Sequence, residues 1–339
     1  MHADRLRHAW VDVAKGICII AVVGLYATHE LVRAFGDAGW LTPWSAFAKP
    51  FRMPDFFLLS GLFLSAVIDR PWRSYLDTKV VHYAYFLVLW VSLIYLFDVY
   101  VLEQDPYGAS ALKVFKLYVW SLLIPDHMLW FIQILPAYFV ATRLLRMVPS
   151  WLLWMAALAL QVANISSGFK PLDNFNQYYV FFLTGHFAAS WIHRMCEQAS
   201  RHPAWAATLF VIWCVINQSA VSTGWAVRPG WEVVFGFLGI TAVVSFSSLM
   251  SCGRVGTWIA RAGANSIVIY LGFYIPMRLF IGLLKRLELG WSPHLLAVAT
   301  VLVGVAAPAL LQRLTATTPL KYLFIRPHWA YLPGVQRER

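Results

Sequence analysis

Charge is the scarcest property of this sequence. Only 13% of its 339 residues are Asp, Glu, Lys or Arg, whereas 60% are hydrophobic and the mean hydropathy is +0.62. A soluble domain of this length has too little interior to hide so much apolar surface. The composition therefore excludes an ordinary soluble globular protein and predicts an integral membrane protein.

The sequence also lacks the usual signatures of metal, nucleotide and nucleophile sites. Its four cysteines show neither the spacing of a metal site nor a paired disulfide framework. It contains no nucleophile elbow, zinc signature, phosphate-binding loop or dinucleotide fingerprint. The net charge of +11 comes from basic residues between apolar runs, not from a basic tail or stripe. We therefore expect no metal, no permanently bound cofactor and no nucleic-acid partner.

What the sequence has in abundance is apolar runs, and a helix needs about 20 such residues to cross a bilayer. The expected spans are Val13–Leu31, Pro54–Ile68, Val80–Leu102, Leu129–Thr142, Trp151–Ile165, Tyr178–Ile192, Ala204–Ala220, Glu232–Met250, Asn265–Leu284 and Leu295–Gln312. The stretch Ala111–Pro125 is short and interrupted by Lys113 and Lys116, so we expect it to be re-entrant or interfacial.

Ten spans place most Lys and Arg residues on the side of the two termini, so the positive-inside rule puts both termini in the cytoplasm. The predicted fold is all-α: a polytopic membrane protein with about ten transmembrane helices, in an inner or plasma membrane. Residues 1–339 then form a single transmembrane domain whose constant partner is the lipid bilayer.

Two features bear on transport. The segment Phe57–Phe63 resembles Phe181–Phe187, which is either a parallel duplication or a coincidence of apolar composition. No expected span carries paired Gly and Pro near its middle, as the broken helices of transporters tend to do. The second feature argues against a transporter.

Ionisable residues inside spans are candidates for function because they are costly in lipid. In the first span, Asp12 and Lys15 lie one turn apart and can form an interfacial ion pair. His29 lies near the outer end of the same span. It is either a general base, with a pKa near working pH, or an interfacial His exposed to water.

A second cluster lies in the segment Phe51–Gly61. Arg52 and Asp55 are neighbours in helical spacing, either lining a pocket for a polar substrate or anchoring the topology. We expect Pro54 in the first turn of the helix.

Basic residues follow at Arg70, Arg73 and Lys79, as a rim for donor phosphates or as plain positive-inside charge. Further along, Asp126 is the expected N-cap of a helix. His127, beside it, is a ligand-binding group, a second base or an interfacial His.

Several of these motifs together resemble the acyltransferase 3 family, and they occur in order along nearly the whole chain. The motifs are Asp12-Val-Ala-Lys-Gly16, Phe51-Arg-Met-Pro-Asp-Phe-Phe-Leu-Leu-Ser-Gly61, Arg70 with Arg73, His127-Met-Leu-Trp-Phe131 and Gly263-Ala-Asn-Ser-Ile-Val-Ile-Tyr270. The family comprises membrane O-acyltransferases, including a fucose 4-O-acetylase-like group. The resemblance implies a ten-helix core that transfers an acyl group, commonly acetyl from acetyl-CoA, to a hydroxyl of a carbohydrate or glycolipid acceptor.

The resemblance is incomplete where the chemistry lies. In the family a basic residue of the first helix is followed eleven places on by a His proposed as the base. Here Lys15 holds the basic position and Tyr26 stands eleven places on, with His29 one turn further. In the tenth-motif region the family often has a His after Ile-Tyr-Leu, and here Gly272-Phe273 holds that place.

The family mechanism nevertheless suggests a role for each candidate residue. The catalytic candidates are His29 as the base and Arg52 as the oxyanion donor, held by Asp55. The binding candidates are Lys15 and Arg73 for the phosphates of acyl-CoA, His127 for substrate, and Tyr26 and Trp130 as cavity walls. Two alternatives stay open: an inactive homologue that binds acyl-CoA or a glycolipid, and a transporter or flippase.

Overall fold

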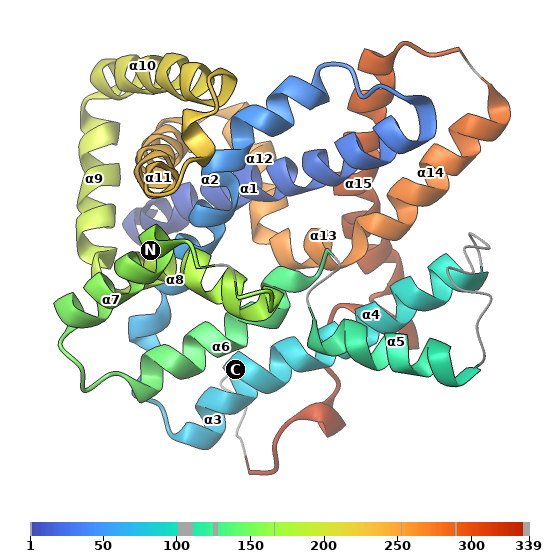
Figure 1. Cartoon of the computed structure of the whole chain (residues 1–339), viewed down its shortest axis with the longest axis horizontal. Coiled ribbons are helices and arrows are strands. Elements are labelled where there is room, and N and C mark those ends of the chain that lie inside the picture. The colour runs from blue at the N-terminus through green and yellow to red at the C-terminus, as the bar shows by residue number, and fades with distance from the viewer. Residues whose placement is uncertain are drawn as a thin grey trace. The chain divides into compact units, whose positions relative to one another are not determined.

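The computed structural model describes residues 2–100, 111–124, 128–165, 167–251, 253–288 and 290–334. Every regular element within these residues is a helix, as the apolar runs predicted (Figure 1). The chain forms two compact units. The first is Met1–Leu64, Ser150–Ile165 and Asn176–Ala309, and the second is Ser65–Pro149, Ser166–Phe175 and Leu310–Arg339.

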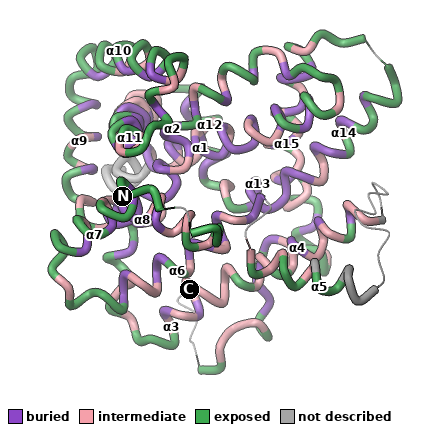
Figure 2. The backbone as a smooth tube through the Cα atoms, in the orientation of Figure 1, coloured by how far each residue is buried: buried purple, intermediate pink, exposed green. Residues whose placement is uncertain are grey.

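In the first unit, α11 lies among α1, α2, α9 and α10 (Figure 1). The helices are α1 (His2–Phe35), α2 (Leu41–Leu62), α7 (Ser150–Ala163), α9 (Ala189–Arg201), α10 (Pro203–Ser222), α11 (Trp231–Met250), α12 (Arg254–Ala264), α13 (Ser266–Gly272) and α14 (Tyr274–Leu287), with a 3₁₀ turn at Trp225–Val227. Figure 2 shows α10 exposed along most of its length. A helix that is both apolar and exposed fits contact with lipid.

The second unit contains α3 (Trp72–Leu76), a π turn η2 (Asp77–Val81), α4 (His82–Tyr100), α5 (Ala111–Leu123) and α6 (Trp130–Leu144), with 3₁₀ turns at Pro319–Leu323 and His328–Ala330. The division between the units falls inside α8 (Lys170–Phe187) and α15 (Pro293–Thr315), and at the 3₁₀ turn Leu64–Ala66.

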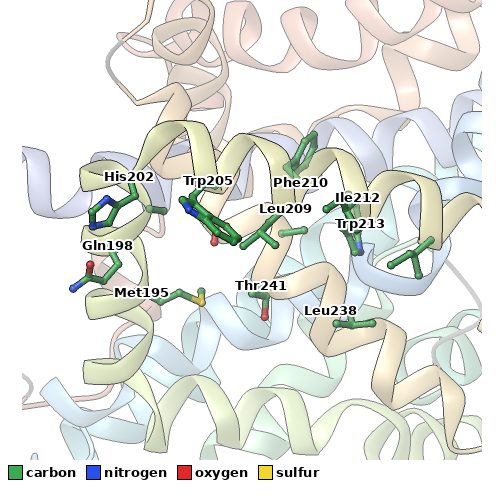
Figure 3. Close-up of a pocket in the computed structure, with 15 residues that line it drawn as sticks. Met195, Gln198, His202, Trp205, Leu209, Phe210, Ile212, Trp213, Leu238 and Thr241 are labelled. Carbon is green, nitrogen blue, oxygen red and sulfur yellow. The ribbon is translucent and has the colours of Figure 1, made fainter.

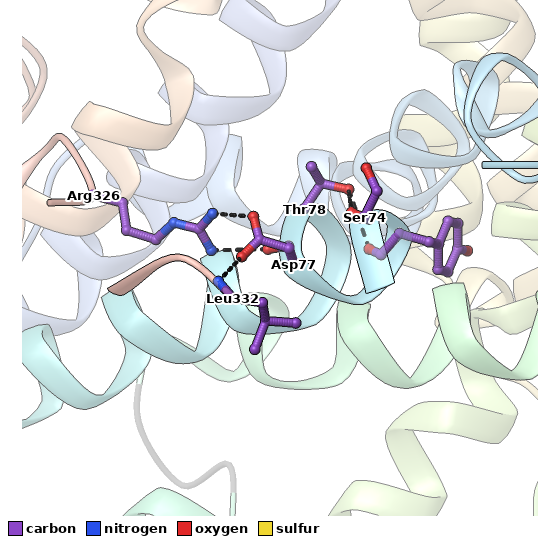
Figure 4. A network of polar contacts seen from close by, with 6 residues as sticks. Ser74, Asp77, Thr78, Arg326 and Leu332 are labelled. Atoms are coloured by element: carbon purple, nitrogen blue, oxygen red, sulfur yellow. Dashed lines mark hydrogen bonds and ion pairs between the residues drawn. The ribbon is translucent and has the colours of Figure 1, made fainter. Parts of the chain in front are cut away.

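A buried ion pair in the second unit fastens the C-terminal segment to η2 (Figure 4). The guanidinium of Arg326 pairs with the Asp77 carboxylate and also donates to the Asp77 carbonyl oxygen at 2.8 Å. The backbone N–H of Leu332 donates to the same carboxylate at 2.8 Å. A buried pair whose polar atoms are largely hydrogen-bonded avoids much of its desolvation cost.

Five of the described helices are long and apolar enough to cross a membrane, so the chain is a multi-pass membrane protein. They are Ala9–Phe35, Trp72–Val99, Pro203–Ser222, Trp231–Met250 and Pro293–Thr315. A sixth span arises if α13 and α14 are counted as one, although they meet at a bend of 51°.

This bend corrects the expectation that no span is broken. The break falls at Phe273, directly after Gly272 and three residues before Pro276. Pro276 has no N–H to donate to the carbonyl of Gly272, four residues earlier, and its ring clashes with that carbonyl. Gly272 and Pro276 are separated in sequence, so the pairing was missed.

One predicted helix start was wrong. Helix α2 begins at Leu41, and Pro54 lies inside it rather than in its first turn. Tertiary packing explains the difference, because Phe51 and Pro54 fit against Gly239 and Gly236 of α11. Helix α6 begins at Trp130, whereas the expected N-cap Asp126 lies outside the described residues.

The two similar segments of the sequence pack against each other. Gly61 of α2 lies against the carbonyl oxygen of Phe182, and Gly185 of α8 lies against that of Leu58. A side chain on either glycine would displace backbone, so both positions need a glycine for the two helices to approach. The similarity therefore has a packing reason, and a duplication stays a prediction.

Candidate functional site

One cavity is an apolar groove of about 620 Å³ between α9, α10 and α11. Figure 3 shows side chains of all three helices pointing into it, including Trp205, Leu209 and Leu238. His202 is the one titratable side chain among the described residues that line it. The groove lies on α10 and α11, two of the spans apolar enough to meet lipid, and has too few polar groups for acyl transfer.

Polar groups are instead concentrated on α2. Asp55 is 1% exposed and Arg52 is 7% exposed. Neither carboxylate oxygen of Asp55 has a hydrogen-bond partner among the described residues, and the same holds for Nε and Nη1 of Arg52. The hydrogen bonds by which Asp55 was expected to hold Arg52 are thus not formed. Buried ionisable groups left unsatisfied are costly, which makes this pair the leading candidate for a working site.

Tyrosine side chains of two other helices lie near Arg52. Tyr26 of α1 and Tyr178 of α8 lie within electrostatic reach of Arg52. The Tyr26 ring packs on Phe273, with centroids 5.3 Å apart, and the Tyr178 ring stacks on Phe57 at 5.1 Å. Phe273, at the bend between α13 and α14, thus contacts Tyr26, which lies within electrostatic reach of Arg52.

The other predicted residues of α1 lie along one helix at different depths. His29 is exposed, and its ring stands 6.3 Å from that of Tyr26. Lys15 is half-buried, with Asp12 within electrostatic reach and Nζ 5.6 Å from the Phe63 ring. Tyr26 follows Lys15 by eleven positions on the helix, a rise of about 16 Å. The helix thus places Tyr26 beside Arg52, and His29 one turn beyond it.

The remaining predicted residues belong to the second unit or lie outside the described residues. Arg73 is exposed on α3, and Trp130 is the first residue of α6. His127 lies outside the described residues. Lys79, from the same basic rim as Arg73, places Nζ 4.4 Å from the Phe139 ring, so cation–π packing already engages it.

Arg143 of α6 is buried in the second unit, with 4% of its surface exposed. Its guanidinium lies 4.1 Å from the Trp72 ring and 4.4 Å from the Tyr75 ring, and it donates to the carbonyl of Arg70. Arg143 is therefore part of the packing of the second unit.

One buried ion pair in the first unit was not predicted from the sequence. Arg278 of α14 pairs with Glu30 of α1, and both side chains are nearly buried. Arg33 also approaches Glu30, at 3.7 Å. The available signal was Arg278 itself, because a cation inside an apolar span needs a partner. The partner is Glu30, the acidic residue next to His29.

Two motifs of the family resemblance pack directly against each other. Gly16 of α1 lies against the carbonyl oxygen of Ile259, and Gly263 of α12 lies against that of Asp12. The contact is reciprocal, with each glycine receiving the carbonyl of the residue four places before the other glycine. These glycines allow the backbones of α1 and α12 to touch.

Comparison with known proteins agrees with the resemblance. The model of an acyltransferase domain, that of the acyltransferase 3 family, matches residues 8–313. Nodulation protein NolL of Sinorhizobium fredii (strain NBRC 101917 / NGR234) is 24% identical over 285 residues, which cover 77% of this chain and 75% of that protein. No solved structure matches the chain. The family match spans nearly the whole chain and every candidate site residue predicted from the sequence, so the protein belongs to the acyltransferase 3 family.

Proposed function

We propose that the protein is a membrane-embedded O-acyltransferase. It moves an acyl group, in the simplest case acetyl, from acyl-CoA to a hydroxyl of a carbohydrate or glycan precursor. Family membership supports acyl transfer in general. The observation that carries the specific site is the buried Arg52–Asp55 pair without satisfied hydrogen bonds.

The proposed reaction is a direct transfer. The acceptor oxygen attacks the thioester carbonyl carbon while a base takes its proton, which forms a tetrahedral oxyanion. Collapse of this intermediate breaks the C–S bond, and the CoA thiolate leaves and takes up the proton as the ester forms. Arg52 is the donor to the oxyanion, because a fixed cation in a dry site stabilises developing negative charge. His29 is the base, reaching the acceptor from the exposed side of Tyr26.

The donor is proposed to enter from the cytoplasm. Ten spans with both termini inside would place the Lys15 end of α1 near the cytoplasmic face of an inner or plasma membrane, where Lys15 binds phosphates of acyl-CoA. Arg73, in the second unit, keeps its proposed role in binding donor phosphate. The length of α1 between Lys15 and Tyr26, about 16 Å, suits a donor whose phosphates and thioester are joined by an extended arm. His127 and Trp130 complete the substrate-binding set.

The test follows CoA thiol release over time by purified protein supplied with acetyl-CoA and a panel of methyl glycosides. Arg52→Gln should lower acceptor-dependent release by about 10²–10³-fold, the usual effect of losing one oxyanion donor. Arg254→Gln, an exposed arginine at the start of α12, is the control and should keep parent activity. Parent protein that never releases thiol in response to any acceptor would contradict the proposal.

One observation favours an inactive homologue. Tyr26 holds the position at which the family carries the His proposed as the catalytic base. Tyr26 lies within electrostatic reach of Arg52, whereas the nearest His in the sequence, His29, is exposed. Such a protein would bind acetyl-CoA without turnover, and Tyr26→His would create activity by restoring the family spacing from Lys15. Acetyl-CoA binding with no thiol release distinguishes this case from the enzyme.

A second observation favours a transporter. Helices α13 and α14 form a bent pair, and discontinuous helices line the binding sites of many carriers. Uptake of a labelled glycoside into sealed proteoliposomes, with no thiol release from acetyl-CoA, would identify it.

A further inference from the structure

A second pocket in the first unit is small and polar. It lies between α2, α7, α8 and α11, beside the 3₁₀ turn Trp225–Val227. Its polar lining consists of Lys49, Gln161, Gln177, Tyr178 and Glu232. Its volume of about 60 Å³ holds a few water molecules, which is the size of a few hydroxyl groups rather than of an acyl chain.

Gln161 is the residue in this pocket that calls for a ligand. It lies on α7, is 5% exposed, and its Oε1 has no hydrogen-bond partner among the described residues. A buried acceptor left without a donor costs about 1–3 kcal/mol. A ligand O–H or N–H in the pocket would satisfy this oxygen.

The other polar groups narrow the class of ligand. Glu232 is hydrogen-bonded to Gln177 and lies within electrostatic reach of Lys49. An ammonium only donates, an ionised carboxylate only accepts, and an amide does both. An anionic ligand would face Glu232 and a cation would face Lys49, whereas a hydroxyl can donate to Glu232 or Gln161 and accept from Lys49. The set thus matches neutral vicinal hydroxyls.

The apolar part of the lining fits the same ligand. Tyr178 and Phe181 contribute aromatic rings to the pocket, and Pro50 and Pro54 contribute apolar ring surface. A sugar ring carries C–H groups on its faces and hydroxyls at its edge, so aromatic walls beside polar groups suit both surfaces.

The pocket adjoins the Arg52–Asp55 pair. Tyr178 lines the pocket and lies within electrostatic reach of Arg52. Lys49 and Arg52 lie one turn apart on α2, and Pro54 directly precedes Asp55. We propose that this pocket is the acceptor subsite, which binds vicinal hydroxyls of a neutral saccharide through Gln161, Gln177, Glu232 and Lys49. Its place in catalysis rests on the proposed function, whereas its saccharide binding does not.

The test measures binding of radiolabelled methyl glucoside, galactoside and fucoside to the purified full-length protein by equilibrium dialysis. Gln161→Met, which keeps the length of the side chain, and Glu232→Gln should weaken the tightest glycoside about fivefold or more, as expected for one lost hydrogen bond. Gln218→Met on the exposed face of α10 and Glu197→Gln on α9 are the matched controls and should stay within twofold. Acetyl-CoA binding should be unchanged in all four variants.

Two results would overturn the inference: no glycoside binds the parent, or binding is the same in Gln161→Met and Glu232→Gln as in the parent. If Gln161→Met does not fold, Gln161→Asn keeps the amide but withdraws it by one methylene, and unchanged binding in that variant overturns the inference too. Failure of the proposed function is a different result. A parent that binds glycoside through Gln161 but never releases CoA thiol supports the pocket and contradicts acyl transfer.

Discussion

Arg52 and Asp55 are ionisable residues that the fold buries without satisfying their hydrogen-bonding groups. Nε and Nη1 of Arg52 and both oxygens of Asp55 have no hydrogen-bond partner in the described part of the chain. In a protein selected for stability alone, apolar residues of similar size would serve better at both positions. Such conflicts between local preference and structure are expected at working sites, where stability is given up for function.

Arg52→Met should therefore separate activity from stability. Acceptor-dependent release of CoA thiol should fall about 10²–10³-fold, because the oxyanion loses its donor. The midpoint of thermal unfolding in detergent should stay the same or rise, since Met needs no hydrogen bonds in a buried place. A variant that loses stability together with activity would show that Arg52 holds the fold rather than the transition state.

His29 yields a prediction of its own, because the structure leaves it exposed while Tyr26 lies beside Arg52. If His29 is the base, His29→Ala should lower turnover about 10²–10⁴-fold in protein that is still inserted and folded. Tyr26→Phe should have a much smaller effect, because a phenol with an ordinary pKa of about 10 stays protonated at neutral pH and is a poor base. Turnover that survives His29→Ala would remove this assignment and leave the family assignment intact.

At the scale of elements, hydropathy locates the long apolar helices but misses helical segments that form because they pack against other helices. The long apolar runs located α1, α10, α11 and α15, and most of the predicted ends of these helices lie within a few residues of the observed ends. The first half of α2 was missed because Lys49, Arg52 and two prolines interrupt its apolar pattern. The glycines against which it packs, Gly24 of α1 and Gly239 of α11, lie elsewhere in the chain.

The site likewise contains residues that the sequence could select and contacts that it could not. Charge in an apolar context was enough to select Arg52 and Asp55 from the sequence. The unsatisfied oxygen of Gln161, the partner of Arg278 and the clasp between Asp77 and Arg326 depend on residues far apart in the chain. The sequence signals that Arg278 needs a partner, but a single sequence does not identify which residue pairs with which.

The reciprocal glycine contact between α1 and α12 leads to a stability prediction with a built-in control. Gly16→Ala and Gly263→Ala each direct a methyl group at a backbone carbonyl that cannot move aside, and should destabilise the protein by about 1–3 kcal/mol or more. Gly282→Ala on α14 meets nothing within 4 Å, and should stabilise its helix by about 0.5–1 kcal/mol. Thermal unfolding in detergent measures all three. Equal effects at Gly16 and Gly282 would exclude the packing argument.

At the scale of the whole molecule, the number of crossings decides which face each site can use. Five of the described helices meet the length and hydropathy needed for a span, or six with the bent pair, whereas the charge pattern predicts about ten. An even number returns both termini to the same side, and an odd number separates them. The proposed entry of acyl-CoA beside Lys15 requires the N-terminal end of α1 to be cytoplasmic.

Reporter fusions along the chain test this topology. Helix α7 is the predicted span whose crossing most needs testing, because it is short. Fusions after Arg146, Arg201 and Arg261 should report cytoplasm, and fusions after Gln104, Phe169 and Val227 should report the outside. Helix α7 has 14 residues, hence a length of about 21 Å against roughly 30 Å of hydrocarbon, so it crosses only with flanking residues or a thinned bilayer. A cytoplasmic signal after Phe169, with Arg146 also cytoplasmic, would show that α7 does not cross. Every later span would then invert, and the polar pocket formed in part by α7 would need a different route for its saccharide.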